Sequence, residues 1–171
     1  YSHPQWLVER YFSRLGTNGA LAMCQANNNA ALLTIRPTDP NADRWTLMEA
    51  LIDEGARVSD TERGECGIRI EYHPNPFRGD SFSKNLWVVQ DEASQLVVEL
   101  LDPNPGERVW DVCAAPGGKT RYIAQRMGDE GFVLATDIDE RKVETLIDTI
   151  PEEIVHVRQH NAVAPLDGYD Q

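Results

Sequence analysis

Asp111-Val-Cys-Ala-Ala-Pro-Gly-Gly-Lys-Thr120 carries the strongest fold signal in this sequence. It follows a short apolar run at residues 108–110 and opens a segment, 121–127, with helical spacing of apolar residues. A strand that turns through proline and glycines into a helix brings backbone N–H groups and a helix N-terminus to one point. These ten residues therefore predict a loop that binds an anionic or strongly polar ligand.

Two widespread nucleotide-binding motifs do not fit this loop. The P-loop pattern G-x-x-x-x-G-K-[ST] matches at Gly118-Lys119-Thr120, but Cys113 stands where the pattern needs its first glycine. The dinucleotide pattern G-x-G-x-x-G fails because the nearby glycines are Gly117, Gly118 and then Gly128. A nucleotidase built on a P-loop is therefore a remote alternative.

Acidic residues end two consecutive predicted strands. Asp111 closes the apolar run before the loop, and Asp137 closes Phe132-Val-Leu-Ala-Thr136 one strand-helix-strand unit later. An acid at the end of the second strand of such a unit can accept hydrogen bonds from ribose hydroxyls. The pair favours a nucleoside-containing cofactor over the alternative of a purely structural turn.

The loop resembles the S-adenosylmethionine loop of the RNA cytosine-C5 methyltransferases, and within that family it is most similar to the ribosomal RNA small-subunit methyltransferase B branch. A second segment, Trp87-Val-Val-Gln-Asp-Glu-Ala-Ser-Gln-Leu96, resembles the segment that precedes the loop in this family. The two motifs lie at the family's usual mutual distance. A weaker similarity runs back to Ser2-His3-Pro4.

The resemblance implies S-adenosylmethionine as the cofactor and assigns its contacts. The loop residues expected around its methionine and ribose end are Cys113, Ala114, Ala115, Pro116, Gly117, Gly118 and Lys119, with Asp111 near the amino group. Asp137 would accept from the ribose hydroxyls, and Ile138 would lie against the adenine. Asn161 stands where the family has an aspartate, and its carbonyl oxygen can still accept from the adenine amine.

The resemblance also implies the reaction, which is methylation of carbon 5 of a cytosine in RNA, with 16S ribosomal RNA as the expected substrate. In that family one cysteine thiolate attacks carbon 6 of the cytosine and a second assists release, and both lie in Pro-Cys motifs. The chain has no Pro-Cys pair, since its cysteines are Cys24, Cys66 and Cys113. We therefore expect the nucleophile beyond Gln171, no catalytic residue in this chain, and no activity from the chain alone.

Two alternatives stay open. One is a methyltransferase of the same family that acts on tRNA, and the other is a complete, non-catalytic module that binds RNA or the cofactor. The chain begins at Tyr1 and ends at Gln171 outside any predicted element, so we expect a piece of a longer protein.

The predicted fold class is α/β, with four regions along the chain. Residues 1–29 form a helical segment that begins at Pro4 and is interrupted at Gly16, with a turn at Asn18-Gly19. Residues 30–73 form a small α+β (RRM-like or ferredoxin-like) subdomain with strands at 32–36 and 67–72 around a helix at 42–54. In that helix the side chains expected to face inward are Trp45, Met48, Leu51 and Ile52.

Residues 74–90 are rich in proline, glycine and small polar residues and predict a linker, ending in a short strand at 86–89. Residues 91–171 form the first half of a Rossmann-like methyltransferase domain. A helix at 92–101 precedes strands at 108–112, 132–136 and 154–157 that alternate with helices at 119–127 and 140–150, the pattern of a parallel sheet. The resemblance implies further strands, so one sheet edge is expected to be open.

The composition limits the possible partners. The net charge is −12, and residues 1–90 carry nine Lys and Arg against eleven Asp and Glu, so most of the negative charge lies in the second half. No apolar run is long enough to cross a bilayer, and the histidines and cysteines lack metal-ligand spacing. We therefore predict no membrane partner, no metal, a cytoplasmic location, and RNA contacts in the first half, with Arg36, Arg44 and Arg69 as candidates.

Overall fold

The computed structural model describes residues 2–128, 130–151 and 153–165. It divides into two compact units, Tyr1–Leu32 and Leu33–Gln171. Within the described residues no helix is both long and apolar enough to cross a membrane.

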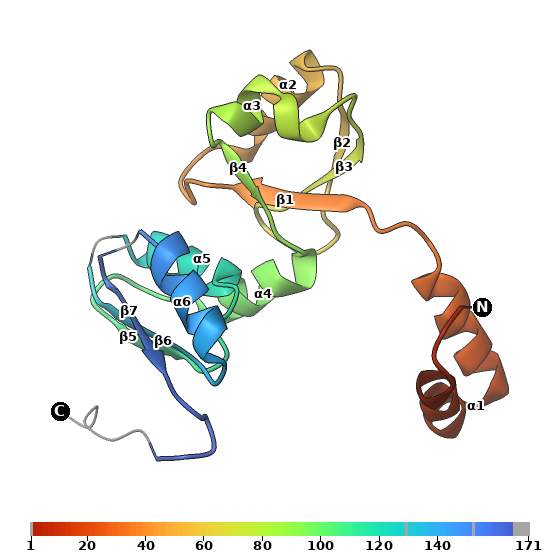
Figure 1. Ribbon diagram of the computed structural model, residues 1–171. Helices are drawn as coiled ribbons and strands as arrows, with labels where there is room; N and C mark the ends of the chain where they lie inside the picture. The colour runs from red at the N-terminus through yellow and green to blue at the C-terminus, as the bar shows by residue number, and fades with distance from the viewer. Residues whose placement is uncertain (1, 129, 152, 166–171) are drawn as a thin grey trace. The chain divides into compact units, whose positions relative to one another are not determined.

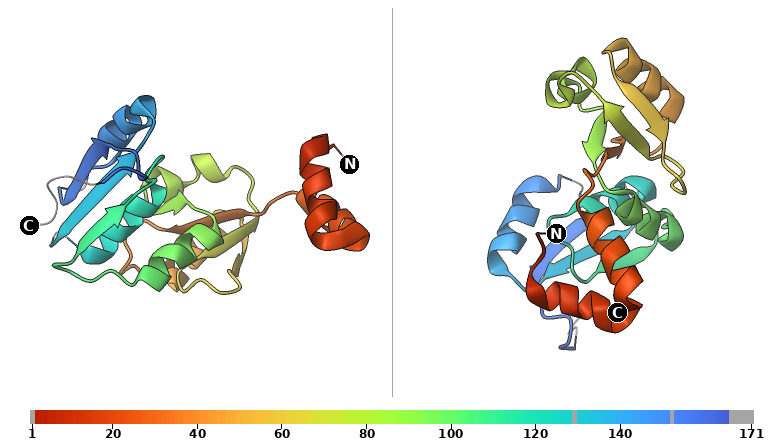
Figure 2. Two further views of the ribbon diagram at one scale, coloured as in Figure 1. Left: turned by 90° about the horizontal axis from the view of Figure 1, so that it is seen from below. Right: turned by 90° about the vertical axis from the view of Figure 1, so that its right-hand side faces the viewer.

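The first unit is one helical segment with a sharp bend. Helix α1 (Gln5–Asn27) is interrupted at Gly16, whose φ of 67° and ψ of −178° are not helical. Figure 2 shows the two helical arms that meet at this bend. The predicted break at Gly16 is confirmed, whereas the turn expected at Asn18-Gly19 is wrong because both residues lie inside the second arm.

The second unit begins with a four-stranded antiparallel sheet. Its strands are β1 (Leu33–Pro37), β2 (Arg57–Asp60), β3 (Ile68–Tyr72) and β4 (Trp87–Val89), in the order β2-β3-β1-β4. Helix α2 (Arg44–Asp53) begins at Asp43, whose side chain accepts from the N–H groups of Trp45 and Thr46. The core of this layer consists of Ile35, Leu47, Met48, Leu51, Ala56, Ile68, Ile70 and Trp87.

Two parts of the predicted subdomain are wrong. Trp45 and Ile52 are exposed rather than inward, because α2 buries the face that carries Leu47, Met48 and Leu51. The segment 74–90 is largely structured instead of a linker: it forms the 3₁₀ helix η1 (Pro76–Arg78) and helix α3 (Asp80–Ser83), and the strand predicted at 86–89 is present as β4. Strand β4 pairs with β1, as Figure 1 shows, and so belongs to the first sheet.

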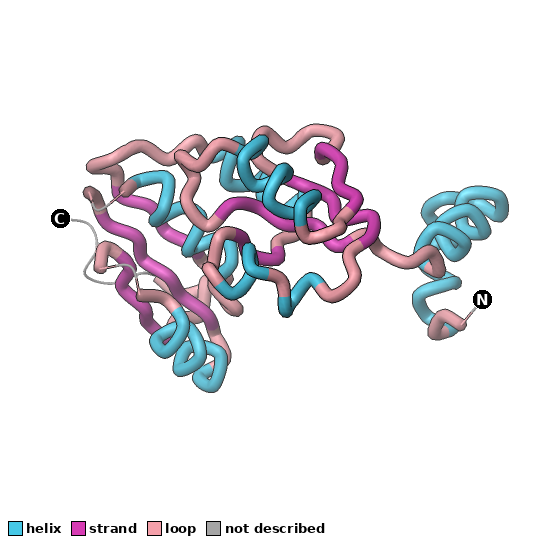
Figure 3. The backbone as a smooth tube through the Cα atoms, turned by 90° about the horizontal axis from the view of Figure 1, so that it is seen from above, coloured by secondary structure: helices cyan, strands magenta, loops and turns pink. Residues whose placement is uncertain are grey.

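The second sheet is parallel and follows helix α4 (Glu92–Leu101). Strands β5 (Arg108–Asp111), β6 (Phe132–Asp137) and β7 (Val155–Gln159) lie side by side in that order, visible in magenta in Figure 3. The connecting helices are α5 (Gly118–Met127) and α6 (Glu140–Thr149). These alternating elements confirm the Rossmann-like pattern expected from the sequence.

Helices α5 and α6 cover the same face of this sheet. Val133 of β6 packs with residues of α5, and Ala135, two positions later, packs with Leu146 of α6. Residues two apart on a strand point to the same face, so both crossovers lie on one side. Because the three strands are parallel, their carboxyl ends lie together at the carboxyl-terminal edge of the sheet. This edge carries the loops after β5, β6 and β7.

The outer edge of β5 is open in the part of the chain that the structure describes, where no strand pairs with it. A hollow of about 670 Å³ runs along this edge, lined by Val97 and Leu101 of α4, by Trp110 and by further residues of β5. The expected open edge is thus present.

Candidate functional site

The loop between β5 and α5 is shaped by one glycine. Gly117 has a φ of 100°, in the left-handed region that favours glycine, and it directly precedes the first residue of α5. A Cβ at Gly117 would lie 3.0 Å from side-chain atoms of Leu146 and of Ile150. The tight turn and the close approach of the end of α6 therefore both require glycine at this position.

Hydrogen bonds join the loop to the neighbouring strand. The Ala114 N–H donates to the Thr136 carbonyl at 2.8 Å, and the Ala115 N–H donates to Oδ2 of Asp137 at 3.3 Å. At the start of the loop, the Thr120 hydroxyl donates to Oδ2 of Asp111 at 2.7 Å. The two acids predicted from the sequence thus lie at the carboxyl ends of adjacent parallel strands, with the loop between them.

Asp137 lies at the end of β6 and is 7% exposed. Its Oδ1 accepts from the Asp139 N–H at 3.2 Å. A carboxylate offers about four acceptor positions, so these bonds leave capacity for ligand hydroxyls. Ile138 follows with 63% exposure, and its carbonyl accepts from the Gln159 side chain at 3.0 Å, so its apolar side chain is held at the surface beside the acid.

Asn161 lies in the turn after β7 and is exposed. Its Oδ1 accepts from the Val163 N–H at 3.2 Å, so part of the acceptor capacity expected for an adenine amine is already used. The preceding residue, His160, donates its backbone N–H to the Asp137 carbonyl at 3.0 Å. This bond brings the turn to the same edge of the sheet as Asp137.

Asp111 and Lys119 both line the hollow beside β5. Cys113 is exposed on the loop. These predicted site residues therefore lie at the carboxyl-terminal edge of the parallel sheet. Asp111 and Lys119 are on the side of the open hollow. Asp137, Ile138 and Asn161 are on the side of β7.

The other two cysteines are unsuited to nucleophilic chemistry. Cys24 is buried in the helical unit, and the Cys66 thiol lies 3.1 Å from the Tyr122 hydroxyl. Burial raises the pKa of the Cys66 thiol, which keeps it protonated and unreactive. Across residues 2–128, 130–151 and 153–165, no group of three or more His, Cys, Asp or Glu side chains is placed to hold a metal ion.

The arginines proposed as RNA contacts are engaged elsewhere. Arg36 is 1% exposed and donates to Gln90 and Gln125. Arg44 forms an ion pair with Asp60, and Arg69 forms ion pairs with Glu62 and Glu92. Arg36 is therefore no surface contact, and Arg44 and Arg69 hold the fold of the first sheet.

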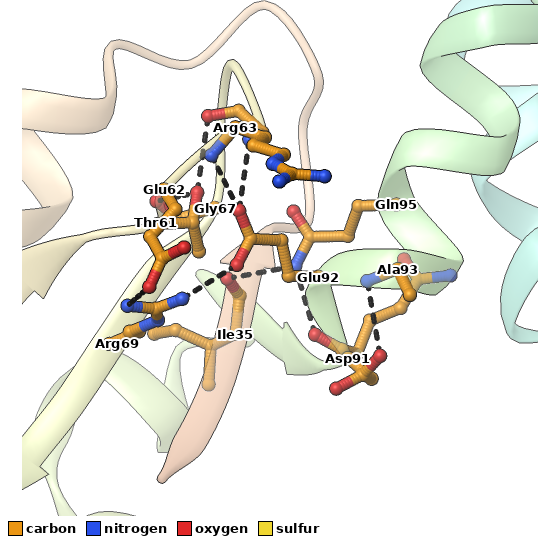
Figure 4. A network of polar contacts seen from close by, with 12 residues as sticks. Ile35, Thr61, Glu62, Arg63, Gly67, Arg69, Asp91, Glu92, Ala93 and Gln95 are labelled. Carbon is orange, nitrogen blue, oxygen red and sulfur yellow. Dashed lines mark hydrogen bonds and ion pairs between the residues drawn. The ribbon is translucent and has the colours of Figure 1, made fainter. Parts of the chain in front are cut away.

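The segment Trp87–Leu96 makes contacts with the first sheet that the sequence did not predict. Gln95 is fully buried on α4 and donates to the carbonyls of Ile35 and Gln90, while Glu92 accepts from the N–H groups of Arg63 and Gly64 (Figure 4). A second acid on α4, Glu99, accepts from the Glu65 N–H at 3.2 Å. The segment thus joins α4 to the first sheet and to the turn after β2.

Comparison with protein families finds two matches. The model described as Methyltr_RsmF/B-like, ferredoxin-like domain matches residues 3–75, and the model described as 16S rRNA methyltransferase RsmB/F matches residues 98–164. The chain belongs to the RsmB/F methyltransferase family. The range that matches the ferredoxin-like domain includes α1 and strands β1 to β3, and the range that matches the methyltransferase domain includes the parallel sheet.

Similar proteins carry the same family description. The chain is 33% identical to the probable ribosomal RNA small subunit methyltransferase B of Bacillus subtilis, over 94% of the chain and 36% of that protein. It is 31% identical to the ribosomal RNA small subunit methyltransferase B of Pectobacterium carotovorum, over 98% of the chain and 38% of that protein. The chain thus spans about a third of the length of these curated relatives.

Solved structures agree with this RsmB/F fold. A methyltransferase homolog from Pyrococcus horikoshii superimposes with a TM-score of 0.75 at 27% identity, over 93% of the chain and 52% of that structure. NSun6 from the same organism, solved with SFG, has a TM-score of 0.76 at 15% identity, over 92% of the chain and 65% of that structure, and shows the fold alone.

Proposed function

We propose that this chain supplies the S-adenosylmethionine-binding part of an enzyme that methylates carbon 5 of a cytosine in 16S ribosomal RNA. The observation that supports it most strongly is the pair of acids at adjacent strand ends around a glycine turn, in a chain of the RsmB/F family. RNA is the expected partner, since curated relatives of the chain are named as ribosomal RNA methyltransferases. We expect the reaction in the cytoplasm, where three free cysteines stay reduced.

The chemistry of the site suits this cofactor. Asp137 is buried with acceptor capacity left for two ribose hydroxyls, and Ile138 presents an exposed apolar surface beside it for an adenine ring. The loop between β5 and α5 lies between the two acids, and its backbone N–H groups suit the cofactor's carboxylate. When bound, S-adenosylmethionine supplies an electrophilic methyl group.

In the proposed reaction, the residues of this chain bind and orient the cofactor. Asp137 fixes the ribose, and Asp111 and Lys119 lie at the other end of the loop, beside the open edge of β5. Of the three cysteines, Cys24 and Cys66 are enclosed and Cys113 belongs to the loop itself. We therefore propose that the attacking thiolate belongs to none of these three cysteines.

The test is a methyl-transfer assay with the complete gene product that contains this sequence. Unmethylated small-subunit ribosomal RNA and unmethylated tRNA are each incubated with methyl-labelled S-adenosylmethionine, and the digested nucleosides are identified by mass spectrometry. We expect labelled 5-methylcytidine from the ribosomal RNA alone. Label in tRNA alone would support the tRNA alternative, and no transfer to either RNA would contradict the proposal.

A further inference from the structure

A small pocket lies between the first sheet and the start of α5, next to the proposed cofactor loop. Its volume is about 140 Å³. The residues that carry its chemistry are Arg36, Gln90, Pro116, Gly117, Gly118 and Arg121. The pocket shares the glycine turn with the cofactor loop, but Asp111, Asp137 and Ile138 do not line it.

Gln90 brings an unsatisfied donor into this pocket. The side chain is 7% exposed, its Oε1 accepts from Nε of Arg36 at 2.5 Å, and its Nε2 has no hydrogen-bond partner among the described residues. The bond from Arg36 fixes the orientation of the amide, because the flipped amide would place one donor against another. Nε2 lies 3.7 Å from the position of a Cβ on Gly118, so it points at the first turn of α5.

The first turn of α5 offers donors at the same place. Helix α5 has ten residues, and the N–H groups at its start have no acceptor within the helix. The Gly117 N–H donates to the Ala114 carbonyl at 2.7 Å, so the turn available for a ligand begins at Gly118. A helix N-terminus also carries partial positive charge. The Gln90 side-chain amide and the first turn of α5 thus both point hydrogen-bond donors into the pocket.

The charge of the pocket differs from that of the chain. The net charge of the chain is −12, yet the lining of the pocket includes Arg36 and Arg121 and, among the described residues, no acid. The Arg36 guanidinium lies 4.3 Å from the centre of the Tyr122 ring and donates to the Pro37 carbonyl at 2.9 Å, so a positive charge is fixed behind Gln90. The pocket is therefore suited to an anion with several acceptor oxygens.

We propose that this pocket binds one phosphodiester of the RNA backbone, with Gln90 Nε2 and the N-terminal N–H groups of α5 donating to its non-bridging oxygens. The volume holds a few waters or one phosphate group. The source of the phosphate rests on the proposed function, which makes RNA the substrate. The contact positions the RNA and reads no base.

The test replaces the donor and keeps the bond to Arg36. Gln90→Glu retains an acceptor for Arg36 and puts a negative oxygen where Nε2 faces the helix. The matched control is Gln125→Glu, because Oε1 of Gln125 also accepts from Arg36, at 2.9 Å, and Gln125 does not line the pocket. Affinity for a fluorescein-labelled single-stranded RNA is measured by anisotropy at several salt concentrations, and affinity for S-adenosylmethionine by calorimetry.

We expect Gln90→Glu to weaken RNA binding about tenfold and to reduce the salt slope by about 1, as for the loss of one phosphate contact. Its affinity for S-adenosylmethionine should stay within about twofold of the original chain, and Gln125→Glu should leave both affinities within the same range. If Gln90→Glu leaves the affinity for RNA unchanged, the pocket holds water only. An equal loss of cofactor affinity would mean that the anion is the cofactor's carboxylate.

A second measurement separates this site from the proposed function. Inorganic phosphate is titrated into the ¹⁵N-labelled chain, and the signals of the Gln90 side-chain amide and the Gly118 backbone amide are followed by NMR. Saturable shifts that Gln90→Glu abolishes support the pocket even if the chain binds no RNA, in which case the proposed function fails. Absence of shifts together with normal RNA binding overturns the pocket and leaves the proposed function in place.

Discussion

Gly117 is the residue on which the shape of the loop depends most. Gly117→Ala should lower the free energy of unfolding by about 1–3 kcal/mol, because a side chain is strained at positive φ and its Cβ would crowd Leu146 and Ile150. Gly118→Ala is the matched control, since its Cβ would meet only Gln90, at an ordinary 3.7 Å. Urea denaturation measures both, and equal unfolding midpoints for the two variants would contradict the requirement.

The sequence predicts some of the site residues better than others. Asp111 and Asp137 each end an apolar run, so their place at adjacent strand ends follows from strand and helix periodicity. The unsatisfied amide of Gln90 does not follow from any local pattern, because Arg36 comes from a strand 54 residues earlier. The engagement of Asn161 by Val163, two residues later, depends on the conformation of the turn after β7, which the strand pattern does not give.

Helix α4 is the element that joins the two sheets, and Glu92 in its first turn is its main anchor. Burial by itself would raise the pKa of the Glu92 carboxyl, but the Arg63 and Gly64 N–H groups and the Arg69 guanidinium hold that pKa below its ordinary value of 4.5. A carboxyl with a depressed pKa stabilises the fold above the ordinary value, and that contribution disappears as the pH falls through the lowered pKa.

Glu92→Ala should therefore lower the free energy of unfolding by about 1.5–3 kcal/mol at pH 7, the range for hydrogen bonds to a charged group. The difference from the original chain should shrink as the pH falls below the ordinary value of 4.5 and through the lowered pKa. Denaturant unfolding at several pH values measures it, with Glu144→Ala, an exposed residue of α6, as the control. A difference that does not change with pH would contradict the role of the charged carboxylate.

The elements themselves were predicted unevenly. Strands and helices after residue 107 follow from alternating periodicity, because each is local and strongly patterned. The strand at β4 was predicted, but its place in the first sheet was not, since that place depends on pairing with β1, about fifty residues earlier. Helical spacing predicted that the Trp45 side chain faces the core, but α2 packs a different face against the sheet.

At the level of the whole chain, the ferredoxin-like sheet and the parallel sheet are connected by polar contacts as well as by α4. Arg36 reaches Gln125 of α5 at 2.9 Å, and Cys66 reaches Tyr122. The proposed phosphate pocket lies at this junction, with Gln90 from one side and Gly118 from the other. An RNA held there would contact both sheets, while the cofactor would be held by the parallel sheet alone.

The most direct test of the cofactor assignment is calorimetric titration of the chain with S-adenosylmethionine. We predict saturable binding at one site and at least about tenfold weaker binding by Asp137→Asn, with Asp148→Asn, on the exposed side of α6, unchanged. An analogue without the two ribose hydroxyls should bind the original chain and Asp137→Asn with equal affinity, since Asp137 then has no partner. No binding by the original chain, or equal binding of S-adenosylmethionine by the original chain and Asp137→Asn, would contradict the account.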